Sequence, residues 1–416
     1  MAATCWTRRK FLRSTAAGVA WATGGARATA GLFTFARQGT SAAPEIGSLE
    51  ELIASAPTAR YWTSTTSATR EADCLACHEA AALPENLEHK HENKVVRCQL
   101  CAQSCLIDDG ERGRCKARMN RGGELKTLVY GRPISVHVDP IEKKPFFHFL
   151  PGRAAFSMAT SGCPLSCKFC QNWEISQARP EDFKPTYLSP DRIVRESTRR
   201  RAPIVAFTYN EPTVFTEYLC DIARIARREG RRSALVSCGF MQEAPLAEMC
   251  RVLDAIKIDL KGFSEDFYSR VCSAQLAPVL RSIKQVAASG IHLEIVNLVV
   301  PTLNDSTSML TELAKWVVGE VGPEVPVHFT RFHPDYQLRN LPPTPVATLE
   351  KAREIALRAG MHYAFVGNVP GHEGNSTYCP KCGEVVIRRH GFLLQEIKID
   401  QGRCAQCQHP IAGVWI

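Results

Sequence analysis

From residue 155 onward, short apolar runs alternate with longer stretches whose apolar positions recur at helical spacing. The apolar runs predict seven strands, at residues 155–160, 204–208, 233–237, 255–259, 292–300, 325–332 and 362–366. The amphipathic stretches predict helices at residues 190–201, 213–229, 242–253, 276–288, 306–318 and 346–359. Strands that alternate with helices in this way run parallel and are joined by right-handed crossovers. Six or seven such units predict an α/β fold built as a partial or complete βα barrel.

Polar residues gather just after the predicted strands. They are Cys163, Asn210-Glu211, Ser237-Cys238-Gly239, Asp259 with Lys261, Asn297 within the fifth strand, and His333. In a parallel barrel the carboxyl ends of the strands form one rim, where active sites are built. Core packing requires none of these polar groups, so the pattern indicates a functional site.

Composition narrows the class of protein. The chain has 416 residues, 45% hydrophobic and 22% charged, which excludes a mainly disordered or fibrous protein. No apolar run reaches the ~18–20 residues that would cross a bilayer. Residues 1–44 contribute +6 of the net charge of +9, so the body of the chain is close to neutral. This balance gives no reason to expect a nucleic-acid partner.

Cysteine is the unusual residue, with 18 copies that are mostly clustered. Disulfide frameworks belong mainly to short secreted chains, whereas gaps of two or three residues let thiolates converge on a metal or cluster. Two groups have four cysteines and one has three: Cys98, Cys101, Cys105 and Cys115; Cys379, Cys382, Cys404 and Cys407; and Cys163, Cys167 and Cys170. We therefore expect metal or cluster sites at all three groups.

The three-cysteine group follows the first predicted strand with the spacing Cys-x3-Cys-x2-Cys. Three thiolates on a 4Fe-4S cluster leave one iron free to bind a substrate or cofactor. Spacing, position and rim together resemble the radical S-adenosylmethionine (SAM) superfamily. The resemblance implies that Cys163, Cys167 and Cys170 are catalytic cluster ligands and that SAM is a cofactor. It also implies reductive cleavage of SAM to a 5′-deoxyadenosyl radical, which abstracts hydrogen from a substrate.

Within that superfamily, the rim resembles the glycyl-radical-enzyme activases, which include the pyruvate formate-lyase activating enzymes. The resemblance implies that Glu211 holds the SAM amino group, and that Asp259 and Lys261 contact its ribose and carboxylate. Ser237 corresponds to a SAM-binding position in a segment where Cys238 departs from the usual Asn. His333 falls beside the expected adenine. The structural alternatives are helix capping for Asp259 and a hydrogen-bonded structural histidine for His333.

Residues 95–416 more closely resemble the radical SAM component of the AmmeMemoRadiSam system. The most specific string is Asp139-Pro140-Ile141-Glu142-Lys143-Lys144-Pro145. This resemblance implies Memo-like and AMMECR-like partners, and SAM cleavage requires an electron donor. Two alternatives remain: a glycyl-radical-enzyme activase, and a multi-centre electron-transfer protein without catalysis. Glu211, Asp259 and Lys261 argue against the second, since electron transfer alone needs no SAM-shaped rim.

The two four-cysteine groups predict small modules before and after the barrel. Cys98, Cys101, Cys105 and Cys115 fit zinc or a second cluster, and a structural metal is slightly favoured. Cys379, Cys382, Cys404 and Cys407 are typical of a zinc ribbon. The 21 residues between their two pairs leave a rubredoxin-like iron site open. The predicted organisation is a signal at 1–44, a linker at 45–92, the first cysteine module at 93–150, the barrel at 151–370 and the ribbon at 371–416.

The amino-terminal region carries two further motifs. Thr7-Arg8-Arg9-Lys10-Phe11-Leu12 followed by an Ala- and Gly-rich stretch resembles a twin-arginine export signal, which predicts a periplasmic or cell-envelope location. The alternative is a disordered basic tail on a cytoplasmic protein. In the linker, Cys74, Cys77 and His78 form a CxxCH motif, which is typical of covalent haem attachment. An extra metal site or an unoccupied pair is the alternative.

Overall fold

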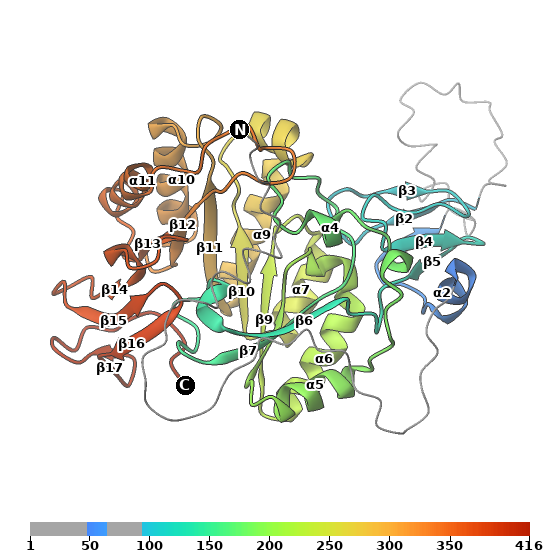
Figure 1. The fold of residues 1–416 in the computed structure, drawn as a ribbon, viewed down its shortest axis with the longest axis horizontal. Coiled ribbons are helices and arrows are strands. Elements are labelled where there is room, and N and C mark those ends of the chain that lie inside the picture. The colour runs from blue at the N-terminus through green and yellow to red at the C-terminus, as the bar shows by residue number, and fades with distance from the viewer. Residues whose placement is uncertain (1–47, 65–93) are drawn as a thin grey trace, which may run out of the picture. The chain divides into compact units, whose positions relative to one another are not determined.

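The computed structural model describes residues 48–64 and 94–416, which all belong to one compact unit, residues 43–416. Its centre is an eight-stranded sheet in the order β13-β12-β11-β10-β9-β8-β7-β6 (Figure 1). Seven strands are parallel: β7 (Ala154–Ala159), β8 (Ile204–Phe207), β9 (Arg232–Ser237), β10 (Ala255–Asp259), β11 (His292–Val299), β12 (Val327–Arg331) and β13 (Ala364–Gly367). The seven predicted strands are confirmed, each within three residues at either end.

The sheet ends at β13 on one side and β6 on the other, so it is a partial barrel. Strand β6 (Ser135–Pro140) pairs antiparallel with β7, with Ser135 opposite Ala159. The sequence analysis missed β6 because five of its six residues are at least partly exposed and give no apolar run.

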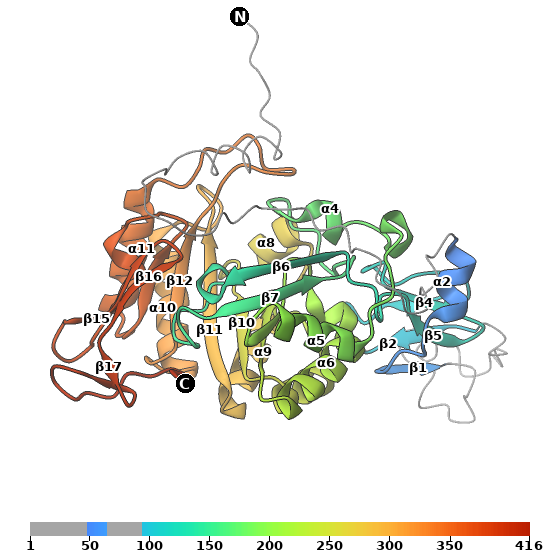
Figure 2. The same ribbon diagram turned by 60° about the horizontal axis from the view of Figure 1, so that its bottom comes forward.

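Six helices follow the predicted stretches: α5 (Pro190–Arg199), α6 (Thr216–Arg228), α7 (Glu243–Val252), α9 (Leu276–Ser289), α10 (Thr307–Glu320) and α11 (Val346–Arg358). A 3-10 turn, η4 (Pro212–Phe215), precedes α6. Helices α5 and α6 contact β8, α6 also contacts β9, and α11 contacts β12 and β13. Figures 1 and 2 show α11 beside β12. Each helix turns its apolar positions toward the sheet, which is the arrangement that helical spacing predicts.

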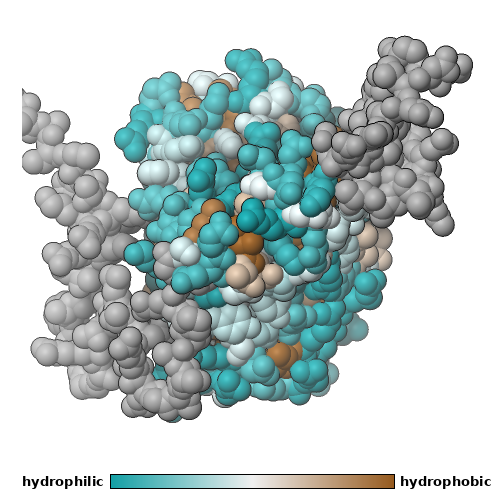
Figure 3. Space-filling view, turned by 90° about the vertical axis from the view of Figure 1, so that its right-hand side faces the viewer, coloured by the Kyte–Doolittle hydropathy of each residue, from teal (hydrophilic) through white to brown (hydrophobic). Residues whose placement is uncertain are grey.

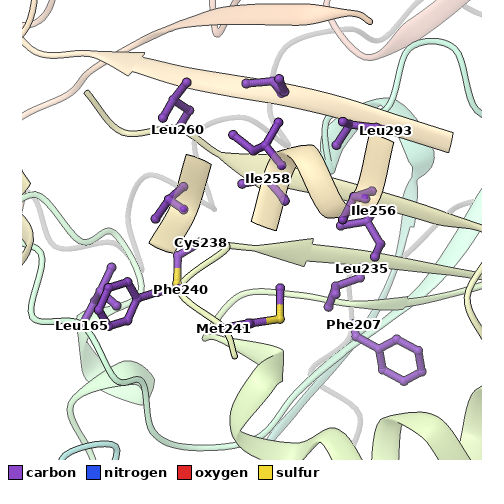
Figure 4. Packing of buried hydrophobic residues seen from close by; sticks show 14 of the residues in the cluster. Leu165, Phe207, Leu235, Cys238, Phe240, Met241, Ile256, Ile258, Leu260 and Leu293 are labelled. Carbon is purple, nitrogen blue, oxygen red and sulfur yellow. The ribbon is translucent and has the colours of Figure 1, made fainter. Parts of the chain in front are cut away.

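The main hydrophobic core lies between these helices and the sheet. Figure 4 shows Phe207, Leu235 and Ile256 on neighbouring strands, with Leu165 and Phe240 at the end of the same cluster. All five side chains are at most 1% exposed. Apolar packing therefore continues from the barrel to the loop that carries the three cysteines.

Residues 49–64, expected to belong to a linker, contribute helix α2 (Leu49–Ser55) and strand β1 (Trp62–Ser64). A capping box between Ser48 and Glu51 starts α2, and Leu52 is buried at 1% exposure. Strand β1 pairs with β2 (Val96–Cys98), which pairs with β3 (Leu106–Ile107), and β4 (Arg118–Arg121) pairs with β5 (Glu124–Thr127). These elements form the amino-terminal cysteine module.

The carboxyl-terminal module consists of strands β14 (Thr377–Tyr378), β15 (Val385–His390), β16 (Leu393–Ile397), β17 (Ile399–Asp400) and β18 (Arg403–Cys404). It contacts Phe147 and His148, which lie before β7: Arg389 donates to the Phe147 carbonyl at 2.5 Å. The same two residues donate their backbone N–H groups to Glu294, near the start of β11. This module therefore covers the amino ends of the strands. Across residues 48–64 and 94–416, none of the helices has the length and apolarity to span a membrane.

Candidate active site at the barrel rim

The loop after β7 carries Cys163, Cys167 and Cys170 and is held in place from two sides. Asn210, just after β8, donates its side-chain N–H to the Gly162 carbonyl at 2.9 Å. On the other side, the Cys272 carbonyl accepts from Ser166 N at 3.2 Å. These hydrogen bonds to backbone carbonyls fix the loop, so the three thiols lie in one region of the rim.

Cys167 is buried, Cys163 and Cys170 are half-buried, and without metal the thiols are mostly protonated. Burial raises the pKa of Cys163 well above its usual value and also raises the pKa of Cys170. The pKa of Cys167 is lowered, chiefly by a hydrogen bond with the Cys272 thiol and also by the nearby Lys261 ammonium. Iron binds thiolates, so cluster assembly must release protons from Cys163 and Cys170.

Glu211 sits at the end of β8, where it caps η4 and is 3% exposed. Its Oε1 accepts from the Ser237 hydroxyl at 2.7 Å and from Thr213 N at 3.1 Å. Its Oε2 accepts from Cys238 N at 2.7 Å. The structure therefore brings two predicted site residues, Glu211 and Ser237, into direct contact. Ser237 acts on the carboxylate and fixes its orientation, while the carboxylate keeps lone pairs for a cation.

Asp259 and Lys261 close β10 beside this group. Lys261 Nζ lies 3.3 Å from Asp259 Oδ2, and Lys257 Nζ pairs with Asp259 Oδ1. Burial opposes the charge on Lys261, but the Asp259 carboxylate outweighs it and raises the pKa of Lys261 well above the usual value. Burial likewise opposes the charge on Asp259, but Lys257 and Lys261 hold its pKa low. The rim thus has a fixed carboxylate and a fixed ammonium close to the cluster thiols.

Three buried polar atoms near the loop have no hydrogen-bond partner among the described residues: Ser161 Oγ, Asn210 Oδ1 and Asn297 Oδ1. The amide N–H groups of both asparagines are engaged, with Gly162 O and with Leu260 O, so their oxygens are oriented. Unpaired buried acceptors are costly, and a ligand with N–H or O–H groups would satisfy them. The residues present therefore fit a cluster together with a polar ligand such as SAM.

His333 is the predicted site residue that stands apart from this group. It follows β12 in an exposed position, and burial together with Arg331 lowers its pKa. The same loop returns to the cysteine loop, because Gln337 N donates to the Lys168 carbonyl at 2.9 Å and Tyr336 stacks on Trp173. His333 thus lies in a loop that contacts the site, while its own side chain is exposed.

The structure adds residues that the sequence analysis did not single out. Lys144 is 3% exposed; its Nζ donates to Asp139 Oδ2 at 2.6 Å and lies 3.2 Å from the Tyr209 hydroxyl. Burial lowers the pKa of Lys144 to about 8, although Asp139 opposes that shift. Tyr209 directly precedes Asn210 and Glu211, so this group adjoins the rim. The Asp-Pro-Ile-Glu-Lys-Lys-Pro string was the available signal, but nothing in it showed that Asp139 and Lys144 would pair.

The other cysteine groups lie in the two modules. Among the residues that the structure describes, Cys379, Cys382, Cys404 and Cys407 form one group with all sulfurs within 4.8 Å of one another, which fits a metal centre. Cys98, Cys101, Cys105 and Cys115 lie in the amino-terminal module, beside the catalytic loop. Cys74, Cys77 and His78, like residues 1–44, lie outside the described residues.

Comparison with known proteins agrees with this geometry. Residues 158–315 match the model of the radical SAM superfamily. The chain is 43% identical over 324 residues to the uncharacterized protein MJ0808 of Methanocaldococcus jannaschii, covering 77% of this chain and 96% of that protein. It therefore belongs to the radical SAM superfamily and is a radical SAM enzyme. These matches do not favour the alternative of a purely electron-transferring protein.

Among named relatives, the pyruvate formate-lyase-activating enzyme of Clostridium pasteurianum is 23% identical over 199 residues, covering 43% of this chain and 80% of that enzyme. A domain of the corresponding Bacteroides vulgatus enzyme is 18% identical with a TM-score of 0.36, covering 39% of this chain and 98% of that domain. A radical SAM methyltransferase from Sphaerobacter thermophilus is 16% identical with a TM-score of 0.43, covering 55% of this chain and 71% of that one. Similarities this distant carry no argument about substrate.

Proposed function

We propose that this enzyme cleaves SAM reductively at a 4Fe-4S cluster bound by Cys163, Cys167 and Cys170, and uses the resulting 5′-deoxyadenosyl radical to abstract hydrogen from a substrate. The observation that carries the proposal is the shared rim: the three thiols lie beside a buried, oriented carboxylate, Glu211, and the partly buried ammonium of Lys261. When bound, the cluster supplies an electron to the SAM sulfonium through its iron without a protein ligand.

The protein's own residues bind and orient. The Glu211 carboxylate offers a negative charge for the amino group of SAM, and Lys261 offers a positive charge for its carboxylate. Asn210 fixes the backbone of the loop through Gly162, and the apolar cluster around Leu165 and Phe240 excludes water from one side. Exclusion of water protects a reactive radical from side reactions.

The direct test is product formation. Anaerobically reconstituted protein, supplied with dithionite and SAM, should yield 5′-deoxyadenosine. The Cys163→Ala/Cys167→Ala/Cys170→Ala variant should yield none while keeping the metal of the carboxyl-terminal group. Equal product from the variant would overturn the proposal. Cys250→Ala, which removes a buried thiol on α7 outside all three groups, is the matched control and should retain full activity.

We also propose that the enzyme works with Memo-like and AMMECR-like proteins, as the resemblance of residues 95–416 to the AmmeMemoRadiSam radical SAM component implies. The resemblance to that system supports this pairing. The test is size-exclusion chromatography of the reconstituted enzyme with each purified protein from the same genome. Co-elution that persists in moderate salt supports the partnership; independent elution of both, with and without SAM, contradicts it.

A further inference from the structure

The carboxyl-terminal and catalytic cysteine groups differ in how tightly their sulfurs are spaced. In the carboxyl-terminal group, Cys379 Sγ and Cys407 Sγ are 3.6 Å apart, and Cys382 Sγ and Cys404 Sγ are 3.8 Å apart. A single tetrahedral zinc with Zn–S bonds of ~2.3 Å places its sulfurs at about this separation. Throughout residues 48–64 and 94–416, no other three Cys, His, Asp or Glu side chains have their ligand atoms all within 4.8 Å of one another.

The three catalytic sulfurs do not all lie within 4.8 Å of one another. A cubane is bound through a different iron corner by each thiolate, so its sulfur ligands stand farther apart than those around one ion. The Cys163, Cys167 and Cys170 thiols nevertheless lie within electrostatic range of one another. The carboxyl-terminal group is therefore spaced for a single ion, and the catalytic group is spaced more widely.

The amino-terminal group resembles the catalytic group in this respect. Cys101 lies within electrostatic range of Cys98, Cys105 and Cys115, yet no three of these four sulfurs lie within 4.8 Å of one another. Backbone pairing holds the group together, since Cys98 N donates to the Cys105 carbonyl at 2.9 Å. Three of the four side chains are buried, and Cys105 is half-buried. Any three of these sulfurs therefore include a pair that is farther apart than the pairs in the carboxyl-terminal group.

A buried cation adjoins the amino-terminal cysteine group. Arg118 is fully buried and lies within electrostatic range of Cys98 and Cys115. It donates to the Arg60 carbonyl at 2.7 Å and to Glu217 at 2.5 Å, while its Nε–H has no hydrogen-bond partner among the described residues. An orphaned N–H in such a position is costly unless an acceptor comes with the ligand. The thiolates of a zinc site accept hydrogen bonds as well, and a 4Fe-4S cluster adds its sulfides as further acceptors.

We propose that Cys98, Cys101, Cys105 and Cys115 bind a second 4Fe-4S cluster, and that this cluster passes electrons to the catalytic one. The cluster assignment stands on the geometry above, while the electron transfer rests on the proposed function. A one-electron protein donor, such as a reduced flavodoxin, reduces the second cluster from the 2+ to the 1+ state. The second cluster returns to 2+ when it reduces the catalytic cluster, and no proton or bond is involved.

The contacts between the module and the catalytic loop support this route. The Cys115 carbonyl lies 2.3 Å from where a Cβ on Gly162 would stand, next to the first catalytic cysteine. Gln103 donates from its side chain to the Pro164 carbonyl at 2.9 Å, inside the same loop. Cys105 is half-buried and is followed by Leu106, which is 50% exposed. Figure 3 shows this side of the molecule, where the surface not covered by grey atoms is mainly hydrophilic with small hydrophobic areas. An electron that enters near Cys105 would pass through the amino-terminal module to reach the catalytic loop.

The first test counts metal in the full-length protein. The Cys163→Ala/Cys167→Ala/Cys170→Ala variant, reconstituted anaerobically with iron and sulfide, should keep about four iron and four sulfide per chain. After reduction it should show the electron paramagnetic resonance signal of a 4Fe-4S cluster, unchanged by SAM. Further substitution of Cys105 by Ala should remove that signal, whereas adding Cys250→Ala instead should not. Circular dichroism checks the fold of each variant. A folded triple variant with two zinc ions, with a single iron, or without metal at this group would overturn the proposal.

The second test concerns electron entry. In the Cys105→Ala variant, formation of 5′-deoxyadenosine driven by reduced flavodoxin should fall at least tenfold, while formation driven by dithionite should change less than twofold. Equal loss with both reductants, or no loss with flavodoxin, would overturn the electron-transfer step. If the wild-type protein makes no 5′-deoxyadenosine at all, the proposed function fails, and the metal count still decides the cluster assignment.

Discussion

At the scale of single residues, the rim is built from charges that are buried and therefore oriented. Glu211 receives hydrogen bonds from Ser237, Thr213 and Cys238, so its carboxylate cannot turn away when the site is empty. An oriented carboxylate in a buried site interacts more strongly with an ammonium than the same group in water. This makes Glu211 the residue whose charge we expect to matter most for SAM.

Glu211→Gln should weaken SAM binding by roughly tenfold or more, because a hydrogen bond to a charged group contributes ~1.5–3 kcal/mol. The amide also faces the Cys238 N–H with less acceptor strength, so we expect a smaller loss of stability of about 1 kcal/mol. Isothermal titration with SAM and thermal denaturation measure the two effects. Ser237→Ala is the matched control, since it removes one donor and keeps the charge. If SAM affinity is unchanged and only stability falls, Glu211 is structural.

A second prediction at this scale concerns Lys144 and Asp139. Lys144→Met should lower the free energy of unfolding by ~3 kcal/mol, because removing one partner leaves a buried carboxylate without its main counter-charge. The double variant Lys144→Met/Asp139→Asn should recover most of this loss, since the neutral amide still accepts from the Tyr209 hydroxyl. Urea denaturation of all four proteins in the cycle gives the coupling. A single variant within 1 kcal/mol of the wild type would contradict a structural role for the pair.

At the scale of elements, the amino-terminal module is in close contact with the catalytic loop at Gly162. Gly162 has φ +95°, and a Cβ there would meet the Cys115 carbonyl at 2.3 Å and Ala117 Cβ at 3.3 Å. The positive φ and the lack of room for a Cβ both exclude a side chain at residue 162. The loop can follow β7 only because residue 162 is glycine.

Gly162→Ala should therefore separate the module from the loop, lower the iron content of the catalytic site and destabilise the protein by more than ~2 kcal/mol. Gly110→Ala is the matched control, because Gly110 has φ +84° with nothing within 4 Å of its Cβ position. The control should cost only the ~1 kcal/mol of the backbone conformation. Iron analysis and chemical denaturation measure both variants, and similar losses in the two would show that the contact with Cys115 is unimportant.

At the scale of the whole molecule, the barrel ends have different roles. The carboxyl ends of the strands hold the candidate active site, while the amino ends are closed by Phe147, His148 and the carboxyl-terminal module. His148 is fully buried; its Nδ1 bonds the Ala412 carbonyl at 2.6 Å, and its Nε2 lies 3.2 Å from Thr377 Oγ1. Burial lowers the pKa of His148 to about 3, although Glu294 opposes that shift. The imidazole is therefore neutral in the folded protein at ordinary pH.

This shift predicts how stability depends on pH. Because the folded pKa lies below the ordinary value of 6.5, the unfolded chain takes up a proton at His148 first as pH falls. Stability should then decrease from about pH 6.5 toward pH 3, by at most ~1.4 kcal/mol per pH unit for this one group. His148→Gln lacks the titrating group, so its profile should be shallower by that amount. Chemical denaturation between pH 7.5 and 4.5 compares them, and parallel profiles would rule out His148 as the source.

The sequence determined the parallel strands, the six main helices and the three cysteine groups, because periodicity and spacing are local properties of the chain. It also indicated the rim, since residues that follow parallel strands must share one edge. The sequence did not predict strand β6, because an exposed antiparallel edge strand has no apolar run. The sequence also could not predict that the His333 side chain is exposed, because exposure depends on how the loop folds back.

Only the tertiary structure decided which groups meet. The pairing of Lys144 with Asp139, the hydrogen bonds from Ser237 and Cys238 to Glu211, and the contact of Cys115 with Gly162 join residues from different strands and modules. Spacing along the chain shows that four cysteines can share a metal, but not how far apart their sulfurs lie. That separation depends on how the backbone packs around them, and it distinguishes the carboxyl-terminal group from the amino-terminal one.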